Sequence, residues 1–251
     1  MQTLHRHQKA DVEGLLKFYG LPVLYEHHIE IPAVVNYPPP WPEGVKFELQ
    51  TFRVDAYCVA DGDGLTAFVD VADPREATLS VPKDVVEAVL ERSKARASKE
   101  FPKADALLKT ILDAGYRIHK GPNNEEILAR KYRIRLRGID APENKQPFGK
   151  EAKEEFTQLV QGNCLTVHVY GEDQYGRHVG DVYCNGKFAQ EIMLKKGLAW
   201  HYYIFDKRRE FKKWEKKARA VKVGLWASPN PEKPWEWRKK HGRDGKLDEL
   251  N

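Results

Sequence analysis

A strand-like segment that cannot run straight is the feature that most constrains the fold of this chain. Basic and apolar residues alternate from 133 to 137 in a strand pattern that extends to 139, and Gly138 and Pro142 interrupt it. Strict alternation places Arg135 on the face opposite Asp140, so the two side chains can meet only if the backbone bends near Gly138. We therefore predict a bent strand end that carries charged residues on both sides of the turn.

Short strand patterns and amphipathic helix patterns surround this bend. The Asn185-Gly186 pair, flanked by strand-like residues, predicts a tight hairpin turn. Several short strands with helices between them predict an α+β fold, a five-stranded OB-fold β-barrel with packed helices. The expected strands lie at 45–57, 65–71, 133–139, 165–170 and 179–184, and the expected helices at 149–161, 189–196 and around 211–221.

Two further segments extend this barrel domain. A helical insertion is predicted at 71–130, and it either lengthens a substrate channel through its basic residues or only adds packing. Near the C-terminus, Trp235 and Trp237 either dock on the body of the protein or contact nucleic acid. The predicted segments are a helical extension and Pro-rich linker at 1–44, the barrel domain with its insertion at 45–227, and a tail at 228–251.

The charge distribution favours a polyanionic partner. The formal net charge is +5, and residues 207–222 carry nine basic and two acidic side chains. Such a segment attracts polyanions, although a solvated helix face would have the same composition. Three cysteines without a close pair are typical of a reducing compartment, and we expect Cys164 and Cys184 to be buried free thiols. The chain as it stands therefore predicts a cytoplasmic location.

Acidic and basic residues in three segments supply the groups that phosphodiester cleavage needs. The segments are Asp-Gly-Asp at 61–63, the bent strand end at 135–143, and Asp-Gln-Tyr-Gly-Arg at 173–177. Their carboxylates can hold a hard cation or activate water, and their guanidinium groups match the geometry of a phosphate. Each segment alone would be an ordinary polar turn, but the three together predict a site for cutting a phosphodiester.

These motifs resemble those of the staphylococcal nuclease family. The matching elements include Asp-Gly-Asp at 61–63, Arg-x-x-x-x-Asp-x-Pro-Glu from Arg135 to Glu143, and Asp-x-Tyr-Gly-Arg at 173–177. Gly-Leu-Ala at 197–199 and Gly-Leu-Trp at 224–226 match as well. The N-terminal segment, the insertion and the Pro-Trp-Glu-Trp-Arg-Lys tail resemble the plant calcium-dependent branch.

The resemblance implies a calcium-dependent endonuclease that hydrolyses DNA and RNA with little sequence specificity and leaves 3′-phosphate ends. It implies that Asp61 supports its turn instead of binding metal. Two positions depart from the family pattern, because Gly64 stands where a threonine is usual and Gln174 replaces a common lysine. The implied roles are calcium ligation by Asp63, Asp140 and the carbonyl of Ala141, catalysis by Arg135, Glu143 and Arg177, and substrate binding by Tyr175 and Tyr203.

Two other functions are compatible with the same sequence. A catalytically impaired nucleic-acid-binding or protein-interaction module would keep the barrel without the chemistry, and Gly64 is the departure that favours it. A lipid-surface adaptor would use the basic helix, whose apolar positions we expect to face inward. The plant branch also implies a lipid-modified N-terminus on a longer precursor, outside this chain, which would give a peripheral plasma-membrane location. No obligate protein partner is inferred.

Overall fold

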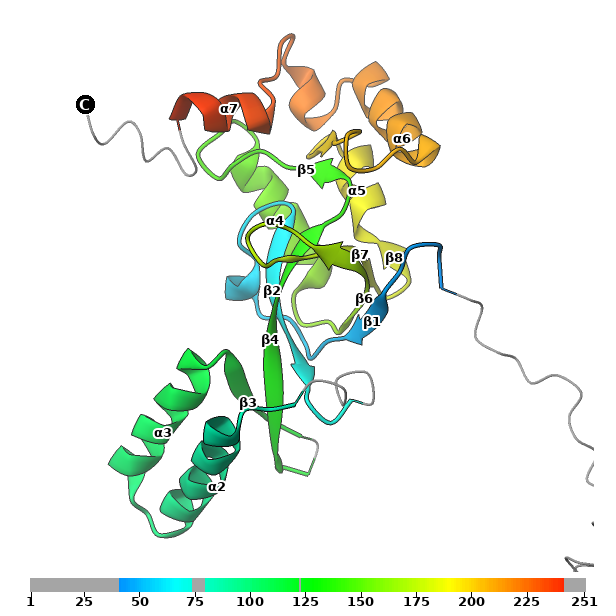
Figure 1. Ribbon diagram of the computed structural model, residues 1–251. Coiled ribbons are helices and arrows are strands. Elements are labelled where there is room, and N and C mark those ends of the chain that lie inside the picture. Colours follow the sequence, from blue (N-terminus) through cyan, green and yellow to red (C-terminus); the bar gives the residue numbers. More distant parts are fainter. Residues whose placement is uncertain (1–40, 74–79, 122, 242–251) are drawn as a thin grey trace, which may run out of the picture. The chain divides into compact units, whose positions relative to one another are not determined.

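The computed structural model describes residues 41–73, 80–121 and 123–241 (Figure 1). The chain divides into two compact units, 1–42 and 43–251, and the described residues belong almost entirely to the second. The predicted N-terminal helix and most of the linker at 1–44 lie outside the described residues. No helix in the described part is long and apolar enough to cross a membrane.

A central sheet lies in the second unit. Five of its strands are hydrogen-bonded side by side in the order β1-β6-β7-β4-β2. Its ladders are antiparallel except for β4 and β7, which run parallel. Two further strands join at the side, β3 on β4 and β8 on β7, while β5 and β9 form a separate pair. The strands are β1 (Phe47–Gln50), β2 (Gly64–Asp70), β3 (Tyr116–Lys120), β4 (Glu126–Leu136), β5 (Ile139–Asp140), β6 (Leu165–Glu172), β7 (His178–Cys184), β8 (Lys187–Phe188) and β9 (Trp200–His201).

The predicted α+β OB-fold is confirmed, but the described strands do not close into a full barrel. Strands β1 and β2 lie at the two ends of the path, and no ladder joins them. A backbone hydrogen bond from the Phe52 N–H to the Phe68 carbonyl (2.8 Å) crosses between these ends. Pairing between the two ends does not extend further, because β1 has only four residues and the chain then forms a 3₁₀ helix at Ala56–Cys58.

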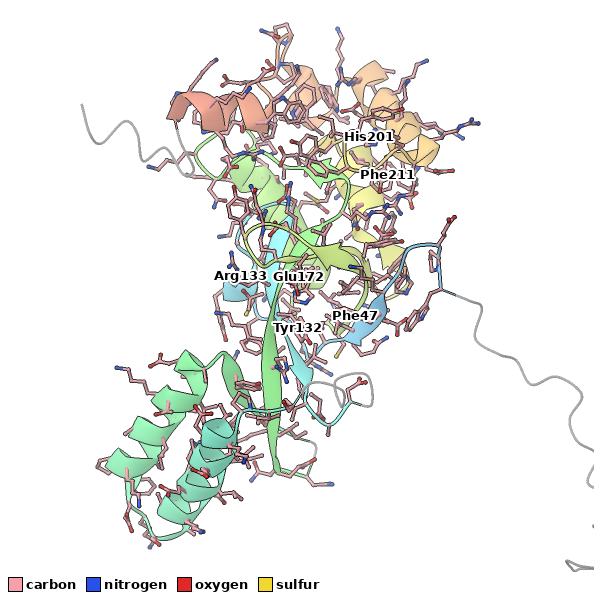
Figure 2. All side chains as sticks on the ribbon, viewed as in Figure 1. Phe47, Tyr132, Arg133, Glu172, His201 and Phe211 are labelled. Carbon is pink, nitrogen blue, oxygen red and sulfur yellow. The ribbon has the colours of Figure 1, made fainter. Side chains whose placement is uncertain are left out.

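Helices cover the sheet and complete its apolar core. Phe156 of α4 and Leu194 of α5 are fully buried among the inward residues of the strands, as their helical spacing predicts. Phe47 of β1 and Tyr132 of β4, both labelled in Figure 2, pack edge-on against the ring of His178, with centroid distances of 5.9 and 4.8 Å. The helices are α2 (Lys83–Ala97), α3 (Phe101–Asp113), α4 (Gly149–Val160), α5 (Ala189–Lys195), α6 (Arg209–Ala220) and α7 (Pro234–His241), with a second 3₁₀ helix at Gly224–Ala227.

The insertion has a small apolar core of its own. Val85 of α2, Ile111 of α3 and Tyr116 of β3 are buried together, apart from the main core. The buried Arg92 donates to Glu126 at 2.6 Å and ties α2 to the start of β4. The predicted helices are confirmed, but the region also contains β3 and the first part of β4, which the helical interpretation missed. Figure 1 shows β4 running from the inserted helices towards the turn before β5.

Several local expectations are confirmed and four need correction. Asn185 and Gly186 have φ angles of 50° and 73°, as the hairpin turn requires. The strand expected at 45–57 is limited to Phe47–Gln50, and part of the remainder forms the 3₁₀ helix at Ala56–Cys58. The strand expected to continue to residue 139 ends at Leu136, because Gly138 turns the chain. Cys164 is exposed instead of buried, since it lies in the loop that precedes β6. Val221, expected on the inward face, is also exposed, because α6 ends one residue before it.

Candidate active site

The turn between β4 and β5 brings Arg135 and Asp140 onto the same side of the sheet. Gly138 has a φ of +75°, which redirects the chain after β4. As a result the Arg135 Nη2 group donates to Asp140 Oδ1 at 2.8 Å and to the Ile139 carbonyl at 3.1 Å. The bend that the alternating pattern required is therefore present, and it places a buried carboxylate directly beside a guanidinium group.

The Asp-Gly-Asp turn brings a second carboxylate to the same place. Asp63 is 4% exposed, and its Oδ2 accepts a hydrogen bond from the Ala141 N–H at 2.6 Å. Its Oδ1 forms an ion pair with Arg135. A Cβ on Gly62 would lie 2.7 Å from the Cβ of Ala141, so the two turns can approach this closely only with glycine at 62.

Asp61 supports this turn, as the resemblance implies. Its Oδ1 accepts a hydrogen bond from the Asp63 N–H at 3.1 Å, which is the contact of an Asx turn. A Cβ on residue 64 would lie 2.9 Å from the same oxygen. Gly64, the departure from the family pattern, therefore leaves the space that the Asp61 carboxylate occupies.

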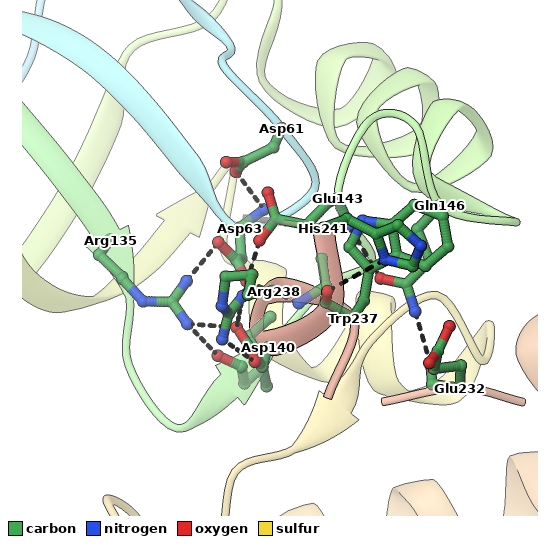
Figure 3. Close-up of polar contacts among 12 residues, drawn as sticks. Asp61, Asp63, Arg135, Asp140, Glu143, Gln146, Glu232, Trp237, Arg238 and His241 are labelled. Carbon is green, nitrogen blue, oxygen red and sulfur yellow. Dashed lines mark hydrogen bonds and ion pairs between the residues drawn. The ribbon is translucent and has the colours of Figure 1, made fainter. Parts of the chain in front are cut away.

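Glu143 faces the same pocket and is bound by a residue from the far end of the chain. Arg238 of α7 donates to Glu143 Oε1 at 2.7 Å and to Asp140 Oδ2 at 2.8 Å. Figure 3 shows the guanidinium groups of Arg135 and Arg238 both directed at Asp140. The acidic groups are thus held by two arginines that come from different elements.

The loop between β6 and β7 contributes Tyr175 and Arg177. The Asp173 carboxylate accepts hydrogen bonds from the Tyr175 and Arg177 N–H groups at 2.9 and 3.0 Å and from Arg177 Nε at 2.7 Å. These bonds lower the pKa of Asp173 even though burial opposes the shift. The Arg177 guanidinium also lies 5.7 Å from the centre of the Tyr175 ring. Both residues line the pocket, with Arg177 held by its own loop.

All but one of the site residues predicted from the sequence line a single pocket of about 590 Å³. The exception is Tyr203, which is 55% exposed and packs edge-on against His201 at 5.7 Å. Its neighbours Tyr202 and Phe205 line the pocket instead. The predicted residues in this lining are Asp63, Arg135, Asp140, Ala141, Glu143, Tyr175 and Arg177.

Comparison with known proteins identifies the family. A family model described as staphylococcal nuclease homologue matches residues 133–228. A protein of Arabidopsis thaliana named as a staphylococcal-like nuclease is 58% identical over 94% of this chain and 72% of its own length. The chain belongs to the staphylococcal nuclease family. A probable staphylococcal-like nuclease of Oryza sativa is 56% identical over 94% of the chain and 71% of its own length. An uncharacterised 38.1 kDa protein of Capnoides sempervirens is 65% identical over 97% of the chain and 71% of its own length.

Burial raises the pKa values of three carboxyl groups in this staphylococcal nuclease site. Burial, together with the charge of Asp63, raises the pKa of Asp61 to about 7. The same two causes raise the pKa of Asp140, although Arg135 and Arg238 oppose the shift. Burial also raises the pKa of Glu143, against the hydrogen bond from Arg238. Additional positive charge in the pocket would therefore favour the ionised form of every one of these acids.

The donor set suits a hard divalent cation. The lining contains five carboxylates and three guanidinium groups, so it carries two uncompensated negative charges when every group is ionised. Asp63 and Asp140 offer only oxygen, the ligand type that calcium prefers, and calcium tolerates an irregular shell completed by carbonyl and water oxygens. The described residues contain no ready cluster of three or more His, Cys, Asp or Glu side chains for a metal. The calcium ligands implied by the family resemblance are two carboxylates and one backbone carbonyl, so they do not require a cluster of three such side chains.

Sequence reasoning missed three residues of this staphylococcal nuclease site. Arg238 comes from a tail for which only the two tryptophans were predicted to make contacts, and the helix at 234–241 was not predicted. Gln146 accepts from the Glu143 N–H at 3.2 Å and donates to the Glu232 carbonyl at 2.6 Å, so it joins the site to the tail. Tyr202 stacks on Trp235 at 5.2 Å, next to Tyr203, the predicted aromatic residue. The basic residues in the tail were the signal that could have revealed Arg238.

Proposed function

We propose that this protein is a calcium-dependent endonuclease that hydrolyses the phosphodiester bonds of DNA and RNA with little sequence specificity and leaves 3′-phosphate ends. One observation carries the proposal: Asp63 from the Asp-Gly-Asp turn and Arg135, Asp140 and Glu143 from the bent strand end at 135–143 converge on one pocket. Membership of the staphylococcal nuclease family supports the same chemistry. The nuclease names of the Arabidopsis and rice relatives support nucleic acid as the substrate.

Each residue has a role that its position allows. Asp63 and Asp140 would hold the cation together with the carbonyl of Ala141. Calcium bound there would supply positive charge next to the scissile phosphate. Glu143 would accept the proton of the attacking water, and its raised pKa brings it closer to neutral pH than an ordinary glutamate.

Two arginines would stabilise the phosphate as the water attacks. Arg135 is buried between Asp63 and Asp140, and although burial alone would lower its pKa, these carboxylates raise it. It therefore keeps a full positive charge at the point where negative charge grows in the transition state. Arg177 lines the opposite loop of the pocket and would bind the phosphate after its Asp173 contact loosens. The P–O5′ bond then breaks, and the 5′ oxygen leaves as a hydroxyl once it is protonated.

The basic surface of α6 fits a polyanionic substrate. The exposed lysines of α6 include Lys212, Lys213, Lys216 and Lys217, while its apolar Phe211 is buried. The helix thus presents charge outwards, as the sequence predicted, which also disfavours a lipid-surface role for its apolar face. Such lysines would attract DNA and RNA independently of sequence.

The proposal is tested by cleavage of a labelled single-stranded DNA in calcium, in magnesium and in the presence of a calcium chelator. Glu143→Gln and Arg135→Ala probe the site, and Glu151→Gln is the matched control because Glu151 is exposed on α4 and does not line the pocket. Each site variant is expected to lose at least about a hundredfold in rate, the scale of one catalytic proton transfer or one lost electrostatic contact. The control is expected to keep its rate.

Two results would contradict this function. Cleavage that survives both site variants would show that the chemistry does not depend on this pocket. DNA binding without cleavage in any metal would favour the alternative of a catalytically impaired binding module. Mapping the products for 3′-phosphate or 3′-hydroxyl ends would check the direction of bond breaking.

A further inference from the structure

Helix α7 places a positive charge inside the pocket. Arg238 contacts Asp140 through both oxygens, at 2.8 Å to Oδ2 and 3.4 Å to Oδ1, and contacts Glu143 at 2.7 Å (Figure 3). Its side chain is 25% exposed, whereas that of Asp140 is 1% exposed. A residue from the C-terminal segment therefore binds both an expected calcium ligand and the expected catalytic base, Glu143.

A few contacts hold α7 on the protein. Trp235 stacks on Tyr202 with 9° between the ring planes and meets Trp200 edge-on at 5.9 Å. The Glu232 carbonyl, just before the helix, accepts the hydrogen bond from Gln146. The helix itself has eight residues, which is about two turns and too short to be stable alone in water. Its position thus depends on the buried Pro234, on Trp235 in its aromatic cluster, on Arg238 and on the Gln146 bond.

The Arg238 contact and a bound cation compete for the same oxygens. Arg135 makes the shorter contact with Asp140 Oδ1, and Arg238 makes the shorter contact with Oδ2. Both Arg135 and Arg238 would repel a cation held by Asp140. Arg135 belongs to the core strand β4, whereas Arg238 comes from the short helix α7, so relief of the repulsion at Oδ2 would come from the withdrawal of Arg238.

We propose that α7 is an autoinhibitory cap, in which Arg238 acts as an internal cation that calcium must displace before the pocket can accept nucleic acid. The inference rests on the proposed calcium-dependent function. A chain that spends most of its time capped binds calcium with an apparent affinity reduced by the uncapped fraction. Displacement of α7 would then couple cation binding to access for the substrate.

The test measures calcium binding directly, by isothermal titration calorimetry of the full chain without substrate. Arg238→Met removes the internal cation, and Trp235→Ala weakens the anchor of α7 without touching the carboxylates. Lys239→Met is the matched control, because Lys239 is the exposed neighbour on the same helix. Hydrogen exchange of residues 234–241, with and without calcium, reports whether the helix leaves.

We expect Arg238→Met and Trp235→Ala to bind calcium about tenfold more tightly than the natural chain, the change that follows if α7 is docked in about nine molecules of ten. Lys239→Met should bind as the natural chain does. In the natural chain, calcium should increase the exchange of 234–241. This increase would not follow if Arg238 only positioned Glu143.

Each opposite result is informative. Equal calcium affinity in the natural chain and Arg238→Met, with unchanged exchange of α7, would overturn the cap and leave the nuclease proposal intact. Weaker binding in Arg238→Met would also overturn it, because Arg238 would then be organising the carboxylates for the cation. Absence of calcium binding in every chain would instead overturn the calcium dependence in the proposed function, and the cap with it.

Discussion

Replacing Gly138 by alanine should lower the stability of the fold through two separable effects. The residue has a φ of +75°, a conformation that an alanine adopts only at a cost. The new Cβ would also lie 2.5 Å from the Cβ and 2.9 Å from Oδ2 of Asp206. Asp206 cannot easily move away, since it is 2% exposed and its carboxylate accepts from Arg208 Nε at 2.9 and 3.0 Å.

The two effects have known scales. The left-handed backbone lowers the free energy of unfolding by about 1–2 kcal/mol for a residue with a Cβ. Overpacking against a buried neighbour lowers it by about 1–3 kcal/mol. Gly138→Ala should therefore lower the free energy of unfolding by about 2–5 kcal/mol. In urea, with an m value of about 2 kcal/mol/M, the midpoint should fall by about 1–2.5 M.

Two other glycines separate the contributions. Gly162 has a φ of +74° with nothing within 4 Å of an added Cβ, so Gly162→Ala should show only the backbone cost of about 1–2 kcal/mol. Gly62 is not in the left-handed region, but its Cβ would meet Ala141 and Ala152 at 2.7 and 2.8 Å, so Gly62→Ala should show only the packing cost of about 1–3 kcal/mol. Equilibrium urea unfolding, followed by circular dichroism, measures all three. The reasoning is refuted if Gly138→Ala costs no more than Gly162→Ala.

Three further predictions concern charge and packing. Burial alone would raise the pKa of Asp206, but the hydrogen bonds from Arg208 lower it below 3.8. The ionised carboxylate therefore stabilises the folded state above that pH. This contribution to stability disappears as the pH falls through the lowered pKa. Asp206→Asn should therefore cost about 1–3 kcal/mol at pH 7 and less in acid, whereas a pH-independent cost in urea titrations would contradict this. Ile111→Ala should lower the stability of the insertion by about 2–5 kcal/mol in thermal unfolding, yet leave cleavage of short oligonucleotides unchanged, because Ile111 belongs to the separate core. A parallel loss of cleavage would show that the two cores are not independent. Replacing Lys213, Lys216 and Lys217 together by glutamine should flatten the salt dependence of DNA binding by about one unit of slope per lost phosphate contact, and an unchanged slope would place the DNA elsewhere.

Local patterns predicted most of the fold because the turns in this chain are specified by its own residues. Asn185-Gly186 predicts the hairpin between β7 and β8, and Gly138 predicts the bend after β4, without reference to any distant contact. The closure of the barrel was overestimated. It depends on how far β1 and β2 approach each other across the sheet, which no local pattern encodes.

The candidate site was predictable where motifs carry it and missed where the tertiary structure assembles it. Asp63, Asp140 and Glu143 lie in short acidic segments with glycine or proline, and the structure brings them to one pocket. Arg238 belongs to a helix that becomes recognisable only when Trp235 stacks on Tyr202 and the Gln146 bond forms. Tyr203 shows the same limit on a smaller scale, because the local turn directs Tyr202 and Phe205, and not Tyr203, to the pocket.

The register of β2 and β4 makes the insertion removable in principle. Asp70 and Ala129 are direct partners in this antiparallel ladder, and the whole insertion leaves and returns at this pair. Partners in such a ladder lie about 5 Å apart, the span that a two-residue turn closes. Excising the intervening residues would therefore leave a hairpin between β2 and β4, at the loss of the β3 ladder and of the His119 stack on Phe52. Arg135, six positions further along β4, would keep its register with Gly64. The insertion could therefore change in length at the Asp70–Ala129 end of the ladder, while the other end of β4, which carries Arg135, keeps its position in the sheet.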